Sequence, residues 1–357
     1  MSRLRIGRTA DGDVTLRAER FNRHTFWCGQ SGSGKTYALG VTLEQLLLNT
    51  RLPLLILDPN ADFVGLGTPR EGADEAAAAA IRAADVRVLQ SSDGNGEPLR
   101  VRYVDLDVRS KAAVLRLDPI AHPDEYNVLL HLEDEFGPMG EHAMLDALST
   151  SDHPGRRKLA TRIENLRVLD WDLWARGATA AEDVIDGRPD AVVLEVSGFA
   201  HHDEPSVAAL SVLDHLWARR QERNPVLIVI DEAHNLCVPE PVTPLQTALT
   251  ERISQIAAEG RKYGLWLLLS TQRPSKIHPN VISQCDNLAL MKMGSPRDLA
   301  ELTEVFGYAS PDLIAKSPGF ALGEGLFAGG FIGAPTIVRV AERVTREGGT
   351  DVKVPLR

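Results

Sequence analysis

The chain contains 357 residues, of which 43% are apolar and 25% are charged, and its formal net charge is −10. These proportions are typical of a folded globular protein and exclude an intrinsically disordered chain. No apolar run approaches the roughly 18 residues of a membrane helix, and residues 1–7 lack a signal-peptide core, so we expect a cytoplasmic protein without membrane contact. The negative charge argues against a polybasic protein that coats nucleic acid.

Residues 1–92 begin with a short β segment and continue with strands and helices in alternation. Alternating apolar residues predict a small hairpin within residues 1–24. From residue 25, continuous apolar runs alternate with stretches of helical periodicity, which is the pattern of a parallel α/β sheet. We expect strands at 25–28, 54–57 and 86–89 and helices at 37–48 and 73–84.

The pattern changes between residues 93 and 188, which predicts a mostly helical insert. Two tryptophans, Trp171 and Trp174, lie three residues apart, and we expect them to pack from one helical face into the core of this insert. A basic stretch near Arg156 and Lys158 is diluted by acidic residues, so it is either a solvated helix of mixed charge or a DNA-binding face. The expected elements are an extended piece at 99–106 and helices at 124–135, 141–148 and 158–169.

The α/β rhythm resumes at residue 189 and completes the core at residue 335. A closing strand and a tail follow at 336–357. The whole chain therefore predicts an α/β fold with a mostly parallel sheet and a helical insert. In this second part we expect strands at 191–196, 226–230, 265–269 and 288–291 and helices at 207–220, 244–259, 279–285 and 296–306.

A glycine-rich motif lies between the first core strand and the first core helix. It matches G-x-x-x-x-G-K-[ST] and predicts a phosphate-binding loop for ATP. The glycines let backbone N–H groups face the phosphates, Lys35 reaches the β- and γ-phosphates, and the Thr36 hydroxyl ligates Mg²⁺. The alternative is a glycine-rich turn with an accidental lysine. The motif consists of Gly29, Gln30, Ser31, Gly32, Ser33, Gly34, Lys35 and Thr36.

Two carboxylates, Asp231 and Glu232, end the very apolar strand at 226–230. The carboxyl end of a buried parallel strand faces the ligand crevice, so both acids are expected beside the phosphates. Asp231 would hold Mg²⁺ through water, and Glu232 would orient and polarise the attacking water. The alternative is a solvated acidic turn.

A third apolar strand, at 265–269, leads into Ser270-Thr271-Gln272-Arg273-Pro274. A polar side chain at this strand end would lie between the two preceding motifs and contact the γ-phosphate. Gln272 is the candidate, and the alternative is a simple strand-terminating turn before Pro274.

Taken together, these motifs and their order resemble the HerA branch of the HerA/FtsK ATPases. The resemblance implies a RecA-like core of the ASCE type and a ring, commonly a hexamer, that uses ATP to translocate double-stranded DNA, often with a partner nuclease. It rests on the glycine loop, Leu54 to Phe63, Val193 to Gly198, Ile230 to His234, Glu259 to Gly264, Ser270 to Pro274 and the closing Thr336 to Gly349.

The same resemblance implies roles for two arginines. Arg261 matches the arginine that enters a neighbouring subunit's site, where it would neutralise charge on the transferred phosphate. Arg23 matches a second arginine near the nucleotide. For each of them the alternative is a surface or interface salt bridge.

The chain departs from the family pattern at two places. Residues 1–24 are too few to form the N-terminal β-barrel of archaeal HerA proteins, so we expect none. Asn60-Ala61-Asp62 replaces a frequent His-Gly-Glu. The missing barrel keeps one alternative to a DNA motor open, namely a regulatory or defence ATPase that controls a partner enzyme. A second alternative is a phosphotransferase, which the same glycine loop could serve, but Glu232 and Arg261 argue against it.

Overall fold

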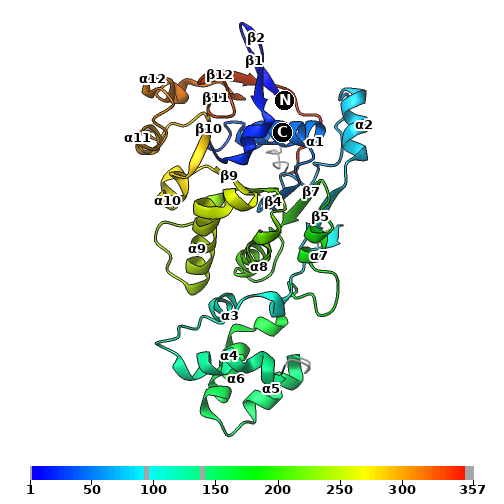
Figure 1. Cartoon of the computed structure of the whole chain (residues 1–357), viewed down its shortest axis with the longest axis vertical. Helices are drawn as coiled ribbons and strands as arrows, with labels where there is room; N and C mark the ends of the chain where they lie inside the picture. The colour runs from blue at the N-terminus through cyan, green and yellow to red at the C-terminus, as the bar shows by residue number, and fades with distance from the viewer. Residues whose placement is uncertain (1, 92–95, 137–140, 350–357) are drawn as a thin grey trace, which may run out of the picture.

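One mixed sheet crosses the upper part of the molecule in the computed structural model, which describes residues 2–91, 96–136 and 141–349 (Figure 1). Its strand order is β2-β1-β12-β11-β10-β3-β9-β8-β4-β7-β5-β6. The strands are β1 (Arg3–Thr9), β2 (Gly12–Arg17), β3 (His24–Cys28), β4 (Leu54–Asp58), β5 (Val86–Gln90), β6 (Glu97–Pro98), β7 (Ala191–Glu195), β8 (Val226–Ile230), β9 (Leu265–Thr271), β10 (Cys285–Met291), β11 (Glu324–Gly329) and β12 (Thr336–Val340).

The run from β10 to β6 is parallel, whereas β1, β2, β11 and β12 pair antiparallel along one side. The sheet is therefore mostly parallel, as the sequence predicts. The helices are α1 (Lys35–Asn49), α2 (Glu75–Ala83), α3 (Val108–Val114), α4 (Pro123–Phe136), α5 (Glu141–Ser149), α6 (Pro154–Leu166), α7 (Ala181–Asp186), α8 (Glu204–Ala218), α9 (Pro244–Glu259), α10 (Pro279–Ile282), α11 (Pro296–Val305) and α12 (Pro311–Ile314).

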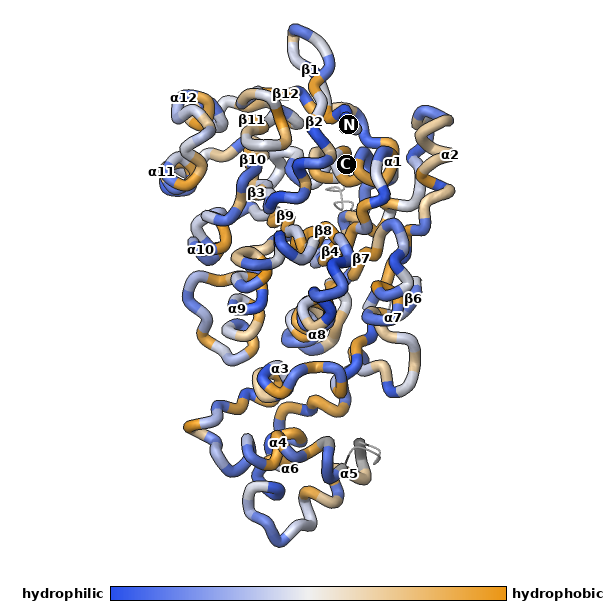
Figure 2. The backbone as a smooth tube through the Cα atoms, in the orientation of Figure 1, coloured by the Kyte–Doolittle hydropathy of each residue, from blue (hydrophilic) through white to orange (hydrophobic). Residues whose placement is uncertain are grey.

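Helices cover both faces of the central strands. Along β8, Leu227 and Val229 pack into the core that contains α1, whereas Ile228 and Ile230 pack into the core that contains α8 and α9. Successive side chains of a strand point to opposite faces, so a strand covered on both sides is apolar throughout. The hydrophobic colour of the central strands in Figure 2 follows from this arrangement.

Helices α3 to α6 form a separate lower lobe within the predicted insert (Figure 1). Helix α6 packs against α4 and α5, and α3 connects the lobe to α8 and α9. Three basic residues of α6 pair with acids of α4, which favours a structural role for this basic stretch. The pairs are Arg156–Glu135, Lys158–Asp124 and Arg162–Glu125.

Several predicted elements were wrong in type or extent. Residues 99–106 do not form one extended piece, since 103–105 make a 3-10 turn, and α3 and β11 were not expected. The helix expected at 279–285 ends at Ile282, because Cys285 already pairs in β10. Trp171 and Trp174 are buried and stacked as expected for packing, but they follow a 3-10 turn rather than share a helix. Among the described residues, no helix is long and apolar enough to cross a membrane.

Candidate nucleotide-binding site

The glycine loop connects β3 to α1 at the carboxyl end of the sheet. Gly32 and Gly34 have φ angles of +70° and +83°, which favour glycine. Helix α1 begins at Lys35, directly after Gly34, and no side chain caps its N-terminus. The first N–H groups of the helix are therefore available to an anion. The Gln30 side chain is engaged elsewhere, because its Oε1 accepts a hydrogen bond from Gly294 N–H.

Lys35 lies among the polar groups at the ends of β8 and β9. Its Nζ is 2.8 Å from Asp231 Oδ1, 2.8 Å from Ser270 Oγ and 3.2 Å from Glu232 Oε1. Burial alone would lower the pKa of Lys35, but the two carboxylates outweigh it and raise the pKa above its ordinary value. The structure thus brings together the lysine and both acids that the sequence singled out.

Glu232 is held by three neighbours. Gln272 Nε2 donates to Glu232 Oε1 at 2.6 Å, Lys35 contacts the same oxygen, and His234 Nδ1 is 3.2 Å from Oε2. Burial would raise the pKa of Glu232, but these contacts with His234, Lys35 and Gln272 lower it to about 2. Gln272 therefore lies beside the acidic pair, at the position where its strand end was expected to place it.

Two further carboxylates follow β4. Asp58 closes the turn after its strand by accepting hydrogen bonds from the N–H groups of Asn60, Asp62 and Phe63. Burial raises its pKa to about 6. Burial, together with the charges of Asp231 and Asp58, raises the pKa of Asp62 to about 7. Asp62 stands where HerA proteins often have glutamate, and no sequence pattern indicated that its pKa lies near neutrality.

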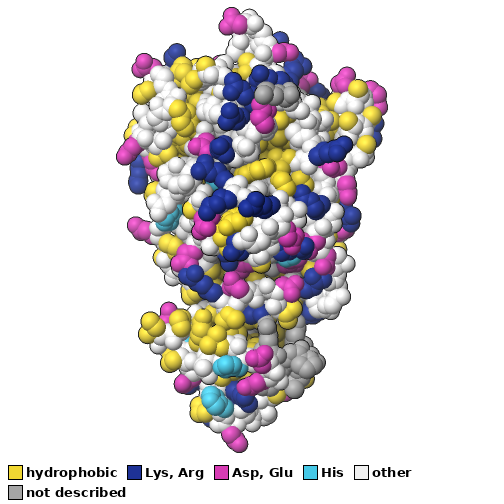
Figure 3. Space-filling model, viewed as in Figure 1, with side chains coloured by type: hydrophobic (Ala, Val, Ile, Leu, Met, Phe, Trp, Pro, Cys, Tyr) yellow, Lys and Arg dark blue, Asp and Glu magenta, His cyan; other side chains and the backbone are white. Residues whose placement is uncertain are grey.

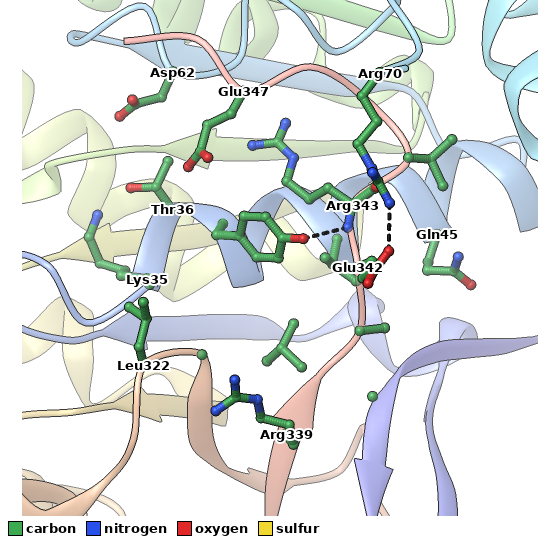
Figure 4. Close-up of a pocket in the computed structure, with 18 of the residues that line it drawn as sticks. Lys35, Thr36, Gln45, Asp62, Arg70, Leu322, Arg339, Glu342, Arg343 and Glu347 are labelled. Carbon is green, nitrogen blue, oxygen red and sulfur yellow. Dashed lines mark hydrogen bonds and ion pairs between the residues drawn. The ribbon is translucent and has the colours of Figure 1, made fainter. Parts of the chain in front are cut away.

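A cavity of about 1490 Å³ extends from the glycine loop along α1 (Figure 4). Lys35, Thr36 and Gln272 line one end, and Asp62 lies on its wall. Leu322 is 66% exposed and lies against the loop, where Gly323 N–H donates to Ser33 O. Other lining residues include Arg5, Arg8, Tyr37, Gln45 and Arg339. The sequence analysis did not predict these residues as part of the site. Arg5, Arg8 and Arg339 come from the distant strands β1 and β12, whereas Tyr37 and Gln45 lie on α1 just after the glycine loop.

The segment after β12 crosses α1 and forms part of this wall. Arg343 and Glu44 make a buried ion pair of 3.2 Å, with both side chains only 1% exposed. Glu44 also accepts the N–H groups of Val344 and Thr345 at 2.8 and 2.9 Å. Tyr37 Oη accepts Arg343 N–H, as the dashed line in Figure 4 shows. A Cβ on Gly40 would come within 2.5 Å of the Arg343 guanidinium, so α1 needs glycine there.

The two predicted arginines lie at the amino ends of the parallel strands, opposite the glycine loop. Arg23 precedes β3 and Arg261 precedes β9, whereas the glycine loop and Gln272 follow these strands. A strand rises about 3.3 Å per residue, so β3 alone separates Arg23 from the loop by roughly 17 Å. The role of Arg23 near a nucleotide stays a prediction, and this distance restricts it to the nucleotide of a neighbouring subunit. Both arginines instead contact Asp286, Arg261 at 2.7 Å and Arg23 at 3.6 Å.

Comparison with known proteins connects this geometry to a family. Residues 4–147 match the family model described as "Helicase HerA, central domain". The probable DNA double-strand break repair helicase HerA of Methanocaldococcus jannaschii is 32% identical over 36% of this chain and 25% of its own length. The DNA double-strand break repair helicase HerA of Pyrococcus furiosus is 22% identical over 90% of this chain and 66% of its own length. The matches thus span less than two thirds of these relatives.

Solved structures share the fold. VirB4 of Thermoanaerobacter pseudethanolicus superposes with a TM-score of 0.64 at 16% identity, over 95% of this chain and 96% of that one. The plasmid coupling protein TrwB, bound to the non-hydrolysable GTP analogue GDPNP, superposes with a TM-score of 0.58 at 14% identity, over 95% and 89%. The core is therefore RecA-like. The fold, the HerA matches and the convergence of Lys35, Asp231 and Glu232 together make the chain similar to P-loop ATPases of the HerA/FtsK type.

Proposed function

We propose that the protein hydrolyses ATP in a ring, most simply a hexamer, and couples this turnover to movement along double-stranded DNA. The observation that carries the proposal is the meeting of Lys35, Asp231, Glu232 and Gln272 at one end of a cavity that begins at the open N-terminus of α1. This constellation suits hydrolysis better than transfer to a second substrate, because Glu232 can orient water.

In the proposed chemistry, Lys35 first exchanges its contacts with the two carboxylates for contacts with the phosphates of ATP. A triphosphate on the glycine loop would draw Nζ from Asp231 and Glu232 toward the β- and γ-phosphates. Loss of this cation would raise the pKa of Glu232 from about 2, which makes its carboxylate a better acceptor for a proton of the attacking water. Gln272, which already contacts Glu232, would position the same water beside the γ-phosphate.

Mg²⁺ is the metal that this site would hold. Thr36 lines the cavity, and Asp231 Oδ2 is buried without a hydrogen-bond partner in the described part of the chain, so both residues fit a hydrated Mg²⁺. Thr36 would ligate it directly and Asp231 through water. When bound, Mg²⁺ would neutralise charge on the β- and γ-phosphates.

The position of the arginines supports the proposed ring. Arg261 and Arg23 cannot reach the glycine loop of their own subunit across the sheet, but they can contact the nucleotide of a neighbour that packs against this edge. An arginine supplied in this way would stabilise charge on the transferred phosphate only after assembly.

Double-stranded DNA is proposed as the track because the curated HerA relatives bear the name of DNA double-strand break repair helicases. Lys and Arg side chains also gather on the upper lobe in the view of Figure 3, despite the net charge of −10. A nuclease or another effector protein is the proposed partner of the ring.

The test is steady-state ATPase activity with and without long double-stranded DNA, at two salt concentrations, with Glu232→Gln as the blank. A DNA motor predicts strong stimulation that falls with salt, since contacts to phosphates release counterions. Turnover that is indifferent to DNA would contradict translocation and favour an ATPase that controls a partner enzyme. A phosphorylated acceptor instead of free phosphate would contradict hydrolysis.

A further inference from the structure

Asp286 lies between the two arginines at the amino ends of the parallel strands, opposite the glycine loop. Its carboxylate is 2.7 Å from Arg261 Nη1 and 3.6 Å from Arg23 Nε. The three side chains come from separate segments. Arg261 precedes β9, Arg23 precedes β3, and Asp286 lies at the start of β10. One carboxylate therefore holds together two guanidinium groups that would otherwise repel each other.

The backbone at Asp286 is irregular in a way that directs this side chain. Cys285 pairs with His24 and Asn287 with Thr25, so Asp286 is the extra residue of a β-bulge between β10 and β3. A bulge re-aims a side chain, and bulges are frequent next to functional sites. The other side of β10 pairs regularly with β11 from Asn287 onward. This pairing holds the backbone next to Asp286 in place.

The cluster is accessible to a neighbouring molecule. Arg261, Arg23 and Asp286 are 38%, 40% and 47% exposed at their side chains. A recess of about 430 Å³, lined by Arg20, Arg23, Asp286 and Tyr308, opens beside them. Beneath them lies buried His24, whose Nδ1 accepts the N–H of Leu267. Ion pairs that are this exposed add little stability, so fold stability does not account for the arrangement.

We propose that Asp286 is a positioning residue that presents Arg261 and Arg23 as a pair to the triphosphate in the adjacent subunit. This inference rests on the proposed ring ATPase and names a residue that regulates its interface. By holding Arg261 in one orientation before assembly, Asp286 reduces the side-chain entropy that is lost when the interface forms. The orientation matters for the rate, because a catalytic group that is misplaced by about 1 Å can lose 100-fold in rate.

The first test compares Asp286→Asn with Glu97→Gln. Glu97 pairs with Arg87 at 2.5 Å with similar exposure, 42% and 48%, at the far edge of the sheet, so it is the matched control. We expect Asp286→Asn to assemble and to lower kcat by about 10-fold to 100-fold, with little change in the KM for ATP, whereas Glu97→Gln keeps the wild-type values. An unchanged or raised kcat, or failure to assemble, would overturn the inference.

The second test uses mixed rings, which separate positioning from a general structural effect. Glu232→Gln subunits have no catalytic glutamate but retain Asp286 and both arginines, whereas Asp286→Asn subunits retain their own catalytic groups. Where the two kinds adjoin, the intact arginines of a Glu232→Gln subunit face the intact catalytic site of an Asp286→Asn subunit. Adding the inactive Glu232→Gln protein should therefore raise the turnover per Asp286→Asn subunit. Simple dilution of activity would contradict the inference.

The failure of the proposed function would look different. If Arg261→Ala retained wild-type turnover, the arginine finger itself would be wrong, and with it the ring mechanism. If Arg261→Ala lost activity while Asp286→Asn behaved like Glu97→Gln, only the role of Asp286 would be wrong.

Discussion

Glu232 is the second residue after β8 and has a φ of +46°, a left-handed conformation that is unusual for a residue with a side chain. This conformation helps to bring its carboxylate to Gln272 and Lys35 rather than letting it continue the strand direction. Strain of this kind persists where the surrounding structure determines it and is frequent at active sites. Glu232 is thus built as part of the site and is not a solvated turn residue.

We expect Glu232→Gln to bind ATP but to lose turnover by about 100-fold to 10,000-fold, because the amide keeps the shape and contacts of the side chain but cannot accept the proton. Single-turnover hydrolysis, with nucleotide binding measured separately, checks this prediction. Glu240→Gln, at an exposed glutamate eight residues later in the sequence, is the control. Comparable hydrolysis by both variants would remove Glu232 from the mechanism.

Asp62 predicts a pH dependence of ATP binding. Its pKa of about 7 means that the carboxylate is mostly protonated at pH 6 and mostly ionised at pH 8. Phosphates in the same cavity disfavour the ionised form, so ATP should bind more tightly at pH 6 than at pH 8 and should take up protons near pH 7. Calorimetry in buffers of different ionisation enthalpy measures this uptake.

Asp62→Asn is the variant that isolates this effect. The neutral amide should strengthen binding at pH 8 and remove most of the difference between pH 6 and pH 8. A pH dependence that is the same in wild type and Asp62→Asn would assign the titration to another group, with Asp58, whose pKa is about 6, as the first alternative.

At the scale of elements, the segment after β12 depends on the buried pair of Glu44 and Arg343. Glu44→Gln would leave the Arg343 guanidinium buried without a countercharge, which should lower the free energy of unfolding by about 3 kcal/mol or more. Glu342→Gln is a control in the same segment, because its pair with Arg70 is exposed and worth about 1 kcal/mol or less. Chemical denaturation compares them, and equal effects would contradict a structural role for the buried pair.

The sequence predicted the elements whose signal is local. Strand β8 and the first four residues of β4 are continuous apolar runs, and β3 is a short β-prone run. Lys35, Asp231 and Glu232 could be placed because they follow β3 and β8 closely in the sequence. Strand β11 was missed because its two glycines, Gly325 and Gly329, weaken the strand pattern. The Glu44–Arg343 pair spans 299 residues and depends on the crossing of the last segment over α1, which no local pattern records.

Across the molecule, the candidate nucleotide site and the two arginines proposed to assist it lie at opposite ends of the parallel strands. The glycine loop and acidic pair follow the strands, and Arg261 with Arg23 precede them. Within one subunit, the glycine loop and the proposed arginine finger, Arg261, therefore cannot contact each other. The sequence motifs predicted the residues of both parts, and the strand order adds that they lie at opposite ends of the strands, which is the reason for proposing a second copy of the chain.

This separation predicts that hydrolysis depends on assembly. Wild-type turnover per subunit should rise with protein concentration until the ring is complete, and Arg261→Ala should assemble and bind ATP yet hydrolyse about 1,000-fold more slowly, the lower end of the loss expected for an arginine finger. Size-exclusion chromatography together with steady-state kinetics measures both. Arg167→Ala, which breaks an exposed pair with Asp170 in the insert, is the control. Rapid hydrolysis by monomeric Arg261→Ala would mean that one subunit completes the site alone, which is incompatible with the strand that separates Arg261 from the glycine loop.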